Sequence, residues 1–248
     1  ASVKDLQGMG IQPDIIVCRS EHPLDQGIKD KIALFCNVPN NRVLQNLDVE
    51  HLYEAPLAME KEYLAQVACE CLKLDCPEPD LTDWKAMVES LRTPTDSVTV
   101  ALVGKYTQLH DAYISVVEAL KHGGISHRCV VDIKWVDSET VTKENVDSIL
   151  RDVNGILVPG GFGDRGIEGK IEAITYAREH KIPFLGLCLG MQLAIVEFAR
   201  NVIGYNDAHS IELDPSTTHP VIALMPDQNG VEDIGGTLRL GSYPFVLD

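Results

Sequence analysis

Short apolar runs in the second half of the chain alternate with segments whose apolar positions recur at helical spacing. The runs cover residues 98–103, 129–136, 155–158 and 184–187. The helical segments that follow them cover residues 111–122, 143–151, 168–180 and 189–202. Asp111 is the expected N-cap of the first helix, and Gly123-Gly124 is its expected stop. Four strand–helix units predict the α/β class with a doubly wound parallel sheet, whose ligands bind beyond the carboxyl ends of its strands.

The first part of the chain has the same alternation in a shorter form. We expect strands at 14–18 and 43–47 and helices at 28–35 and 57–72, the last beginning after Pro56. This pattern is typical of the final part of an α/β domain. The proline-rich stretch 76–80 opens a linker that closes at 93–96, with a short helix at 81–91.

These patterns divide the chain into three expected parts. They are a first domain over 1–80, a linker over 81–96, and a second domain over 97–248. The chain begins inside a helix-like stretch, residues 2–6, and stops within an apolar one, residues 245–248. We therefore expect it to be an interior part of a longer protein.

Composition narrows the class of protein without identifying it. The chain is 45% hydrophobic and 23% charged, as in ordinary globular proteins, and no apolar run reaches the ~18 residues of a membrane span. No signal peptide begins the sequence, so we expect a cytoplasmic location and no membrane partner. The formal charge of −16 disfavours nucleic acid as a partner. An anionic substrate would need a few local cations or backbone N–H groups.

The seven cysteines are odd in number and scattered, which suits a reducing compartment better than a disulfide framework. Cys69, Cys71 and Cys76 lie near one another in the sequence and invite comparison with a zinc site. Their spacing is not C-x-x-C, and no second cluster or nearby histidine completes four ligands. We therefore expect no metal there and interpret the three as incidental helix cysteines.

The strongest catalytic candidate is Cys188 in the motif Gly186-x-Cys188-x-Gly190. An apolar strand precedes the motif and an apolar helix follows it, which is the setting of a nucleophile elbow. A helix N-terminus stabilises a thiolate, and the N–H of Leu189 can point at a developing oxyanion. A buried cysteine packed between glycines remains the alternative interpretation.

A second glycine-rich loop, residues 160–163, follows the preceding strand. It matches neither the dinucleotide fingerprint nor a Walker A loop, but it can supply oxyanion N–H groups. A plain tight turn is the alternative. Because parallel strands end at one edge of the sheet, this loop and Cys188 would each provide half of an acyl-transfer site.

A thiolate nucleophile also needs a general base, usually a histidine oriented by a carboxylate. Of the eight histidines, His219 in His219-Pro220 is the most tempting. Val221 stands where an orienting acid would help, so we do not expect His219 to be the base.

Two stretches carry a family resemblance, VPGGFGDRG at 158–166 and FLGLCLGMQ at 184–192. They resemble the class I glutamine amidotransferases and, within them, the CTP synthase family. Matches at 103–106, 111–113, 118–122 and 235–241, and at 10–20 and 31–39, extend the resemblance over essentially the whole chain. The resemblance implies a flavodoxin-like glutaminase domain preceded by the C-terminal part of a P-loop amidoligase domain.

The resemblance also implies a reaction, in which ammonia released from glutamine aminates UTP to CTP with Mg²⁺-ATP. Cys188 would form the thioester. Other residues that the family pattern assigns to glutamine are Gly161, Leu189, Gly190, Met191, Gln192 and Glu212. The nucleotide contacts that it implies are Lys31 for UTP or CTP, Leu47, Asp48 and Val49 for ATP, and Arg239 for GTP. GTP would be an allosteric activator, CTP a feedback inhibitor, and the protein a homotetramer.

The family's catalytic His and Glu would lie beyond residue 248, and its P-loop and Mg²⁺ ligands before residue 1. Because losing the base lowers turnover by about 10⁴–10⁶-fold, we expect residues 1–248 alone to release negligible ammonia. Two alternatives stay open: another class I glutamine amidotransferase, and a non-catalytic flavodoxin-like binding or assembly module.

Overall fold

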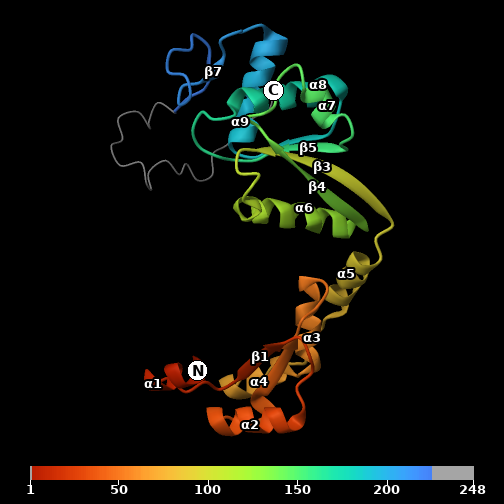
Figure 1. The fold of residues 1–248 in the computed structure, drawn as a ribbon, viewed down its shortest axis with the longest axis vertical. Coiled ribbons are helices and arrows are strands. Elements are labelled where there is room, and N and C mark those ends of the chain that lie inside the picture. The colour runs from red at the N-terminus through yellow and green to blue at the C-terminus, as the bar shows by residue number, and fades with distance from the viewer. Residues whose placement is uncertain (1, 225–248) are drawn as a thin grey trace. The chain divides into compact units, whose positions relative to one another are not determined.

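The computed structural model describes residues 2–224, which form two units that divide between Pro94 and Thr95 (Figure 1). The first unit contains α1 (Ser2–Gly8), β1 (Ile16–Ser20), α2 (Gln26–Cys36), β2 (Val43–Leu47), α3 (Ala55–Lys61), α4 (Leu64–Leu72) and α5 (Thr82–Arg92). The second contains β3 (Asp96–Gly104), α6 (Ile114–Ser126), β4 (Cys129–Asp137), α7 (Val146–Leu150), β5 (Gly155–Val158), α8 (Ile167–His180), β6 (Phe184–Gly186), α9 (Leu189–Phe198), β7 (His209–Ser210) and β8 (Pro220–Ile222).

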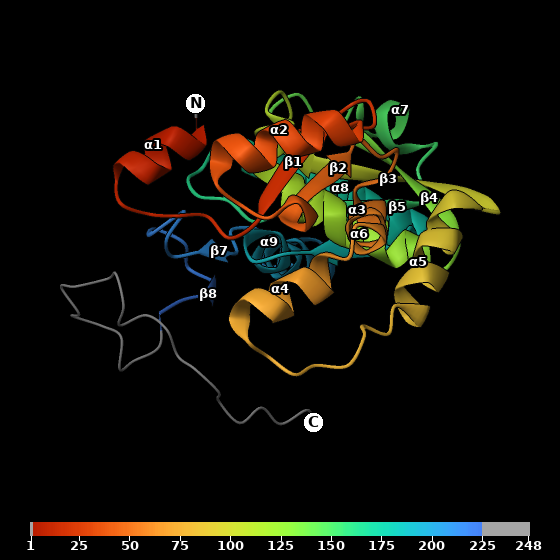
Figure 2. The ribbon, with the colours of Figure 1, turned by 90° about the horizontal axis from the view of Figure 1, so that it is seen from below.

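The first unit is built on the parallel pair β1–β2, with α2 as the crossover between them. The Asp25 carboxylate accepts the N–H of Ile28 at 2.8 Å and so caps α2. Figure 2 shows α2 lying along one side of the two strands, where Ala33, Val38 and Val43 form a small buried core. The strand–helix–strand order predicted from the sequence is confirmed here.

The helix predicted over 57–72 is two helices, so that prediction was wrong. The helix is interrupted at Tyr63, whose φ of 61° lies in the left-handed region. The preceding residue explains the break, because the Glu62 carboxylate is bound at 2.7 Å by Lys29 Nζ and at 3.2 Å by the backbone N–H of Gln45. These bonds fix residue 62 against α2 and β2, and they outweigh the helical periodicity of the surrounding sequence.

The second unit confirms the predicted parallel, doubly wound sheet. The four strands of its main sheet are all parallel and lie in the order β4-β3-β5-β6, which is the flavodoxin-like order for strands numbered along this unit. The strands β7 and β8 form a separate parallel pair. Figure 1 shows α6 on one face of the sheet and α7, α8 and α9 on the other. Leu102 and Leu157 pack toward the α6 side, whereas Ala101 and Ile156 belong to the core on the opposite side.

The helix predicted over 111–122 begins and ends later than expected. A 3₁₀ turn covers His110–Tyr113, so Asp111 is not the N-cap, and α6 continues through Gly123 and Gly124 to Ser126. Gly124 is needed for packing, not for stopping the helix. A Cβ atom there would lie 2.5 Å from the Cys129 carbonyl oxygen, so the glycine lets α6 approach β4 closely.

The two adjacent glycines of α6 should respond oppositely to alanine. We expect Gly124→Ala to lower the free energy of unfolding by about 1–3 kcal/mol, because the new methyl group overpacks against β4. Gly123→Ala is the matched control: no atom lies within 4 Å of its Cβ position, and alanine favours a helix by about 0.5–1 kcal/mol. Urea denaturation measures both; equal changes would contradict the packing role.

Other helix ends also differ from the predicted ones. The helix predicted over 143–151 is shorter in the structure, where α7 begins only at Val146. Just before it, the Asn145 side chain accepts the N–H of Thr142 at 2.8 Å, and this bond favours a turn over a helix. The last predicted helix is α9 followed by a π-helical turn over Ala199–Ile203. Among residues 2–224, none of the helices combines the length and apolar character that crossing a bilayer requires.

Candidate active site

Cys188 occupies a strained turn between β6 and α9. Its φ and ψ are 52° and −107°, a combination that non-glycine residues adopt rarely and at a cost of about 1–3 kcal/mol. The side chain is exposed. A strand, a strained residue and a helix in this order form a nucleophile elbow, which presents the sulfur at the first turn of α9.

The two glycines of the motif allow this turn to pack against its neighbours. A Cβ at Gly186 would lie 2.6 Å from the Gly190 carbonyl, and one at Gly190 would overlap the Val158 carbonyl oxygen. The same Val158 oxygen accepts the N–H of Leu187 at 2.9 Å. The end of β5 therefore supports the elbow directly, and no side chain fits between them.

The structure brings the second glycine loop beside the cysteine, as the sequence predicts. A Cβ at Gly160 would lie 3.3 Å from Cys188 Cβ and 3.9 Å from its Sγ, whereas the Cβ position of Gly161 has no atom within 4 Å. The loop therefore touches Cys188 through Gly160 and leaves open space at Gly161. A substrate carbonyl could approach the sulfur between these two backbone segments.

Two lysines near this loop were not anticipated from the sequence. Lys105 follows β3, and its Nζ donates to the carbonyl oxygen of Phe162 in the loop. Lys170 on α8 is 1% exposed; burial lowers the pKa of its ammonium group, and the neighbouring charge of Lys105 lowers that pKa further. Both are basic residues in a strongly acidic chain, and the contact of Lys105 with Phe162 becomes evident only once β3 and β5 lie side by side.

Glu212 lies in the turn between β7 and β8, and its side chain is exposed. Its backbone N–H donates to Ser210 Oγ at 3.3 Å. The sequence places Glu212 far from Cys188 along the chain. Both residues belong to the second unit, where β7 and β8 pack against α9.

Asp207 accepts several hydrogen bonds within the segment that carries Glu212, and the sequence analysis did not predict this role. Its carboxylate accepts the Thr218 N–H at 2.7 Å, the Thr218 hydroxyl at 2.6 Å and His219 Nδ1 at 2.5 Å. These bonds hold the pKa of Asp207 well below its usual range. His219 also stacks on Tyr205 at 4.3 Å. An acid therefore does orient His219, but it stands at 207, not at 221, and the contacts of the histidine lie within this segment.

The residues assigned to nucleotides lie in the first unit, apart from Arg239, which is outside the described residues. Lys31 is exposed on α2. Leu47 ends β2, and Asp48 follows it, exposed and bound at 3.0 Å by Arg19 Nε. Val49 is half-buried. The structure thus gathers residues 47–49 at the carboxyl end of a parallel strand, where nucleotides bind in α/β folds.

Family models match both halves of the chain. The model described as "Glutamine amidotransferase class-I" matches residues 108–245, and "CTP synthase N-terminus" matches residues 1–74. The CTP synthase of Clostridium acetobutylicum is 58% identical over 246 residues, covering 99% of this chain and 46% of that protein. That of Ruminiclostridium cellulolyticum is 60% identical over 247 residues, covering 100% and 46%. The chain spans about half the length of the curated relatives it matches.

A solved structure is similar to about half of this chain. It is titled "Trypanosoma brucei CTPS - glutaminase domain with bound acivicin". The two chains are 42% identical with a TM-score of 0.50, and the match covers 52% of this chain and 51% of the other.

Proposed function

We propose a function from one premise: this chain belongs to the class-I glutamine amidotransferase family. It provides most of the glutaminase domain of a CTP synthase, within residues 97–248, and the end of the amidoligase domain, within residues 1–80, joined by residues 81–96. The observation that carries the proposal is the strained, exposed Cys188 beside the open backbone of the loop at Gly161. The match of residues 1–74 favours CTP synthase over other amidotransferases.

The geometry suits thioester chemistry on the glutamine side chain. The Cys188 thiolate attacks the amide carbon, and the N–H groups of Leu189 and the glycine loop stabilise the oxyanion. Collapse of this intermediate expels ammonia, which takes a proton from the general acid, and leaves the thioester. Water then hydrolyses the thioester to glutamate and restores the thiol. We assign the acid–base histidine to the part of the protein beyond these residues.

The remaining glutamine contacts come from α9 and the β7–β8 turn. The first turn of α9 lines the substrate with Leu189, Gly190, Met191 and Gln192. Glu212 is the expected partner of the substrate ammonium group, since a carboxylate complements that charge.

The nucleotide side of the proposal rests on the relationship to CTP synthases. It includes Lys31 at UTP or CTP, Leu47, Asp48 and Val49 at ATP, and Arg239 at GTP, in a cytoplasmic homotetramer activated by GTP and inhibited by CTP. Within residues 2–224 no three His, Cys, Asp or Glu side chains gather as metal ligands. From the relationship to CTP synthases we assign the ligands of the Mg²⁺ that accompanies ATP to another part of the protein, and no step here depends on it.

An assay of the intact protein separates the candidate functions. We expect CTP to form from UTP, ATP and glutamine, and also from UTP, ATP and ammonia. Glutamate release without CTP would indicate another class I amidotransferase. Absence of both products would leave the non-catalytic binding or assembly module.

Glu212 offers a test of substrate binding alone. We expect Glu212→Ala to raise KM for glutamine by about 10–100-fold, because a charge-assisted hydrogen bond to the ammonium group contributes about 1.5–3 kcal/mol. Ammonia-dependent CTP formation by the same variant is the internal control and should stay unchanged. An unaltered KM for glutamine would show that Glu212 does not bind the substrate.

A further inference from the structure

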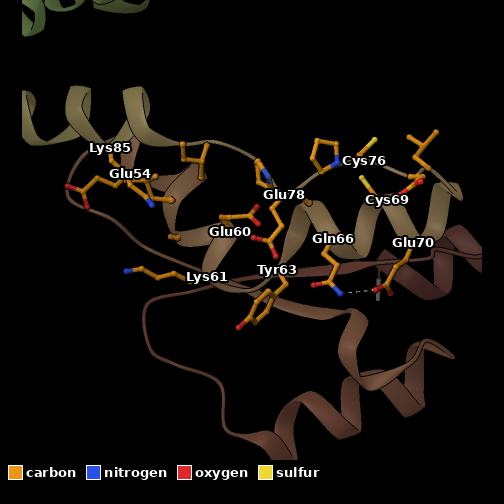
Figure 3. Close-up of a pocket in the computed structure, with 18 of the residues that line it drawn as sticks. Glu54, Glu60, Lys61, Tyr63, Gln66, Cys69, Glu70, Cys76, Glu78 and Lys85 are labelled. Atoms are coloured by element: carbon orange, nitrogen blue, oxygen red, sulfur yellow. Dashed lines mark hydrogen bonds between the residues drawn. The ribbon is translucent and has the colours of Figure 1, made fainter.

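The first unit contains a cavity of about 950 Å³, and no residue of the elbow is among those that line it. It is lined by α3, α4 and the segment that follows α4 (Figure 3). Cys69 and Cys76, two members of the cysteine cluster noted in the sequence, both face it. The third member, Cys71, is not among its lining residues. The cluster is therefore split by the fold into a pair and a single thiol.

The end of α4 brings the pair together. Lys73 ends the helix with a left-handed φ of 57°, and the N–H of Leu74 donates to the Cys69 carbonyl oxygen at 2.9 Å. This cap reverses the chain, so Cys76 returns over the last turn of α4. Figure 3 shows the side chains of Cys69 and Cys76 next to each other at the cavity wall. Cys71 lies two residues further along the helix than Cys69, which turns its side chain away from that wall by about 200°.

The two thiols differ in access and interact with each other. Cys76 is exposed, whereas Cys69 is half-buried. Burial raises the pKa of the Cys69 thiol, and a hydrogen bond with Cys76 raises it further. The exposed Cys76 is thus the thiol that a reagent meets first, and Cys69 is the neighbouring thiol that interacts with it.

We propose that Cys69 and Cys76 form a reversible dithiol–disulfide site that exchanges with small-molecule disulfides of the glutathione type. The Cys76 thiolate attacks one sulfur of the reagent, so one reagent thiolate leaves and a mixed disulfide forms on Cys76. The Cys69 thiolate then attacks the Cys76 sulfur and expels the second reagent thiolate. The protein loses two hydrogen atoms, and the reagent is reduced to two thiols.

The disulfide would affect the segment after α4 more than the stability of the unit. It closes a ring over residues 69–76 only, and a short ring contributes less through chain entropy than a long one. It would nevertheless pin the start of the Pro77-x-Pro79 stretch against the cavity wall. The site is independent of the proposed glutaminase chemistry, since it shares no residue with it.

Oxidation of the full-length protein with glutathione disulfide tests this assignment. Samples are quenched by alkylation and mapped by peptide mass spectrometry. We expect roughly two thiols per chain to be lost as a disulfide joining Cys69 and Cys76, and to be recovered with dithiothreitol. A different cysteine pair, or two free thiols at these positions after oxidation, would overturn the proposal.

Three serine variants separate exchange from simple exposure. Cys69→Ser should accumulate glutathione on Cys76, because the resolving thiol is missing. Cys76→Ser should leave Cys69 unmodified, and Cys71→Ser should form the disulfide as the unmodified sequence does. Equal glutathione adducts on Cys76 with and without the Cys69 thiol would show that the two sulfurs do not react with each other, and would contradict the site.

Discussion

Replacing Cys188 with alanine should abolish glutamine-dependent CTP formation and spare the ammonia-dependent reaction. We expect the glutamine-dependent kcat of the full-length enzyme to fall by about 10⁴-fold or more, because no other group can form the thioester. The alanine removes only the sulfur from an exposed side chain, so the amidoligase half should be unaffected. Product formation with glutamine and with ammonia, followed in parallel, gives the result.

A cysteine elsewhere in the same unit provides the control. Cys129 begins β4 and is half-buried, and Cys129→Ser should retain glutamine-dependent activity. Retention of glutamine hydrolysis by Cys188→Ala, with the same specificity, would exclude a thioester on this residue.

The second large effect is expected at Gly190, where the elbow meets β5. A Cβ at this position would overlap the Val158 carbonyl oxygen, which is backbone and cannot rotate away. We expect Gly190→Ala to lower the free energy of unfolding of the second unit by more than about 3 kcal/mol and to abolish glutaminase activity. Chemical denaturation followed by tryptophan fluorescence measures the first effect, since Trp135 lies on β4.

Gly161→Ala is the matched control for stability. Its Cβ position has no atom within 4 Å, so the unfolding transition should stay where it is. Any loss of glutaminase activity in this variant would then reflect the crowded substrate space and not a damaged fold. Equal stability of the Gly190 and Gly161 variants would contradict the close packing of the elbow on β5.

The sheet could be predicted from the sequence because its signals are local. Each apolar run, such as 155–158, predicts a strand, and the helical spacing after it predicts a crossover helix. Strands joined by such helices lie parallel in one sheet, as they do here. Helix ends were less predictable, since they depend on distant partners. Gly124 has the sequence signature of a helix stop, but it lies inside α6, where only a glycine leaves room for the Cys129 carbonyl group. The helix is interrupted at Tyr63 because the Glu62 carboxylate is bound by residues of α2 and β2.

The candidate site divides in the same way. The elbow has a compact motif at the end of a predicted strand, so Cys188 and the loop at Gly160 could be named as candidates from the sequence. Asp207 could not, because its partners Thr218 and His219 lie eleven and twelve residues away in a loop of irregular backbone. Lys105 likewise has no motif of its own that points to the Phe162 carbonyl; that contact exists because β3 and β5 are neighbours.

The close packing around Cys188 maintains its strained backbone conformation. The left-handed φ of Cys188 would relax if the chain could move, but the backbone of Gly186, Gly190 and Val158 is packed too closely to allow it. The sulfur is therefore held outside the sheet at the first turn of α9. A rigid nucleophile beside an open glycine loop needs little rearrangement when a substrate carbonyl arrives.

Covalent labelling of the intact protein tests the role of Cys188 most directly. A glutamine-analogue alkylating reagent, added at limiting concentration and followed by peptide mass spectrometry, should modify Cys188 ahead of the six other cysteines of this sequence. Excess glutamine should protect it. Labelling spread evenly over the seven cysteines, or unaffected by glutamine, would mean that the elbow does not bind glutamine at all.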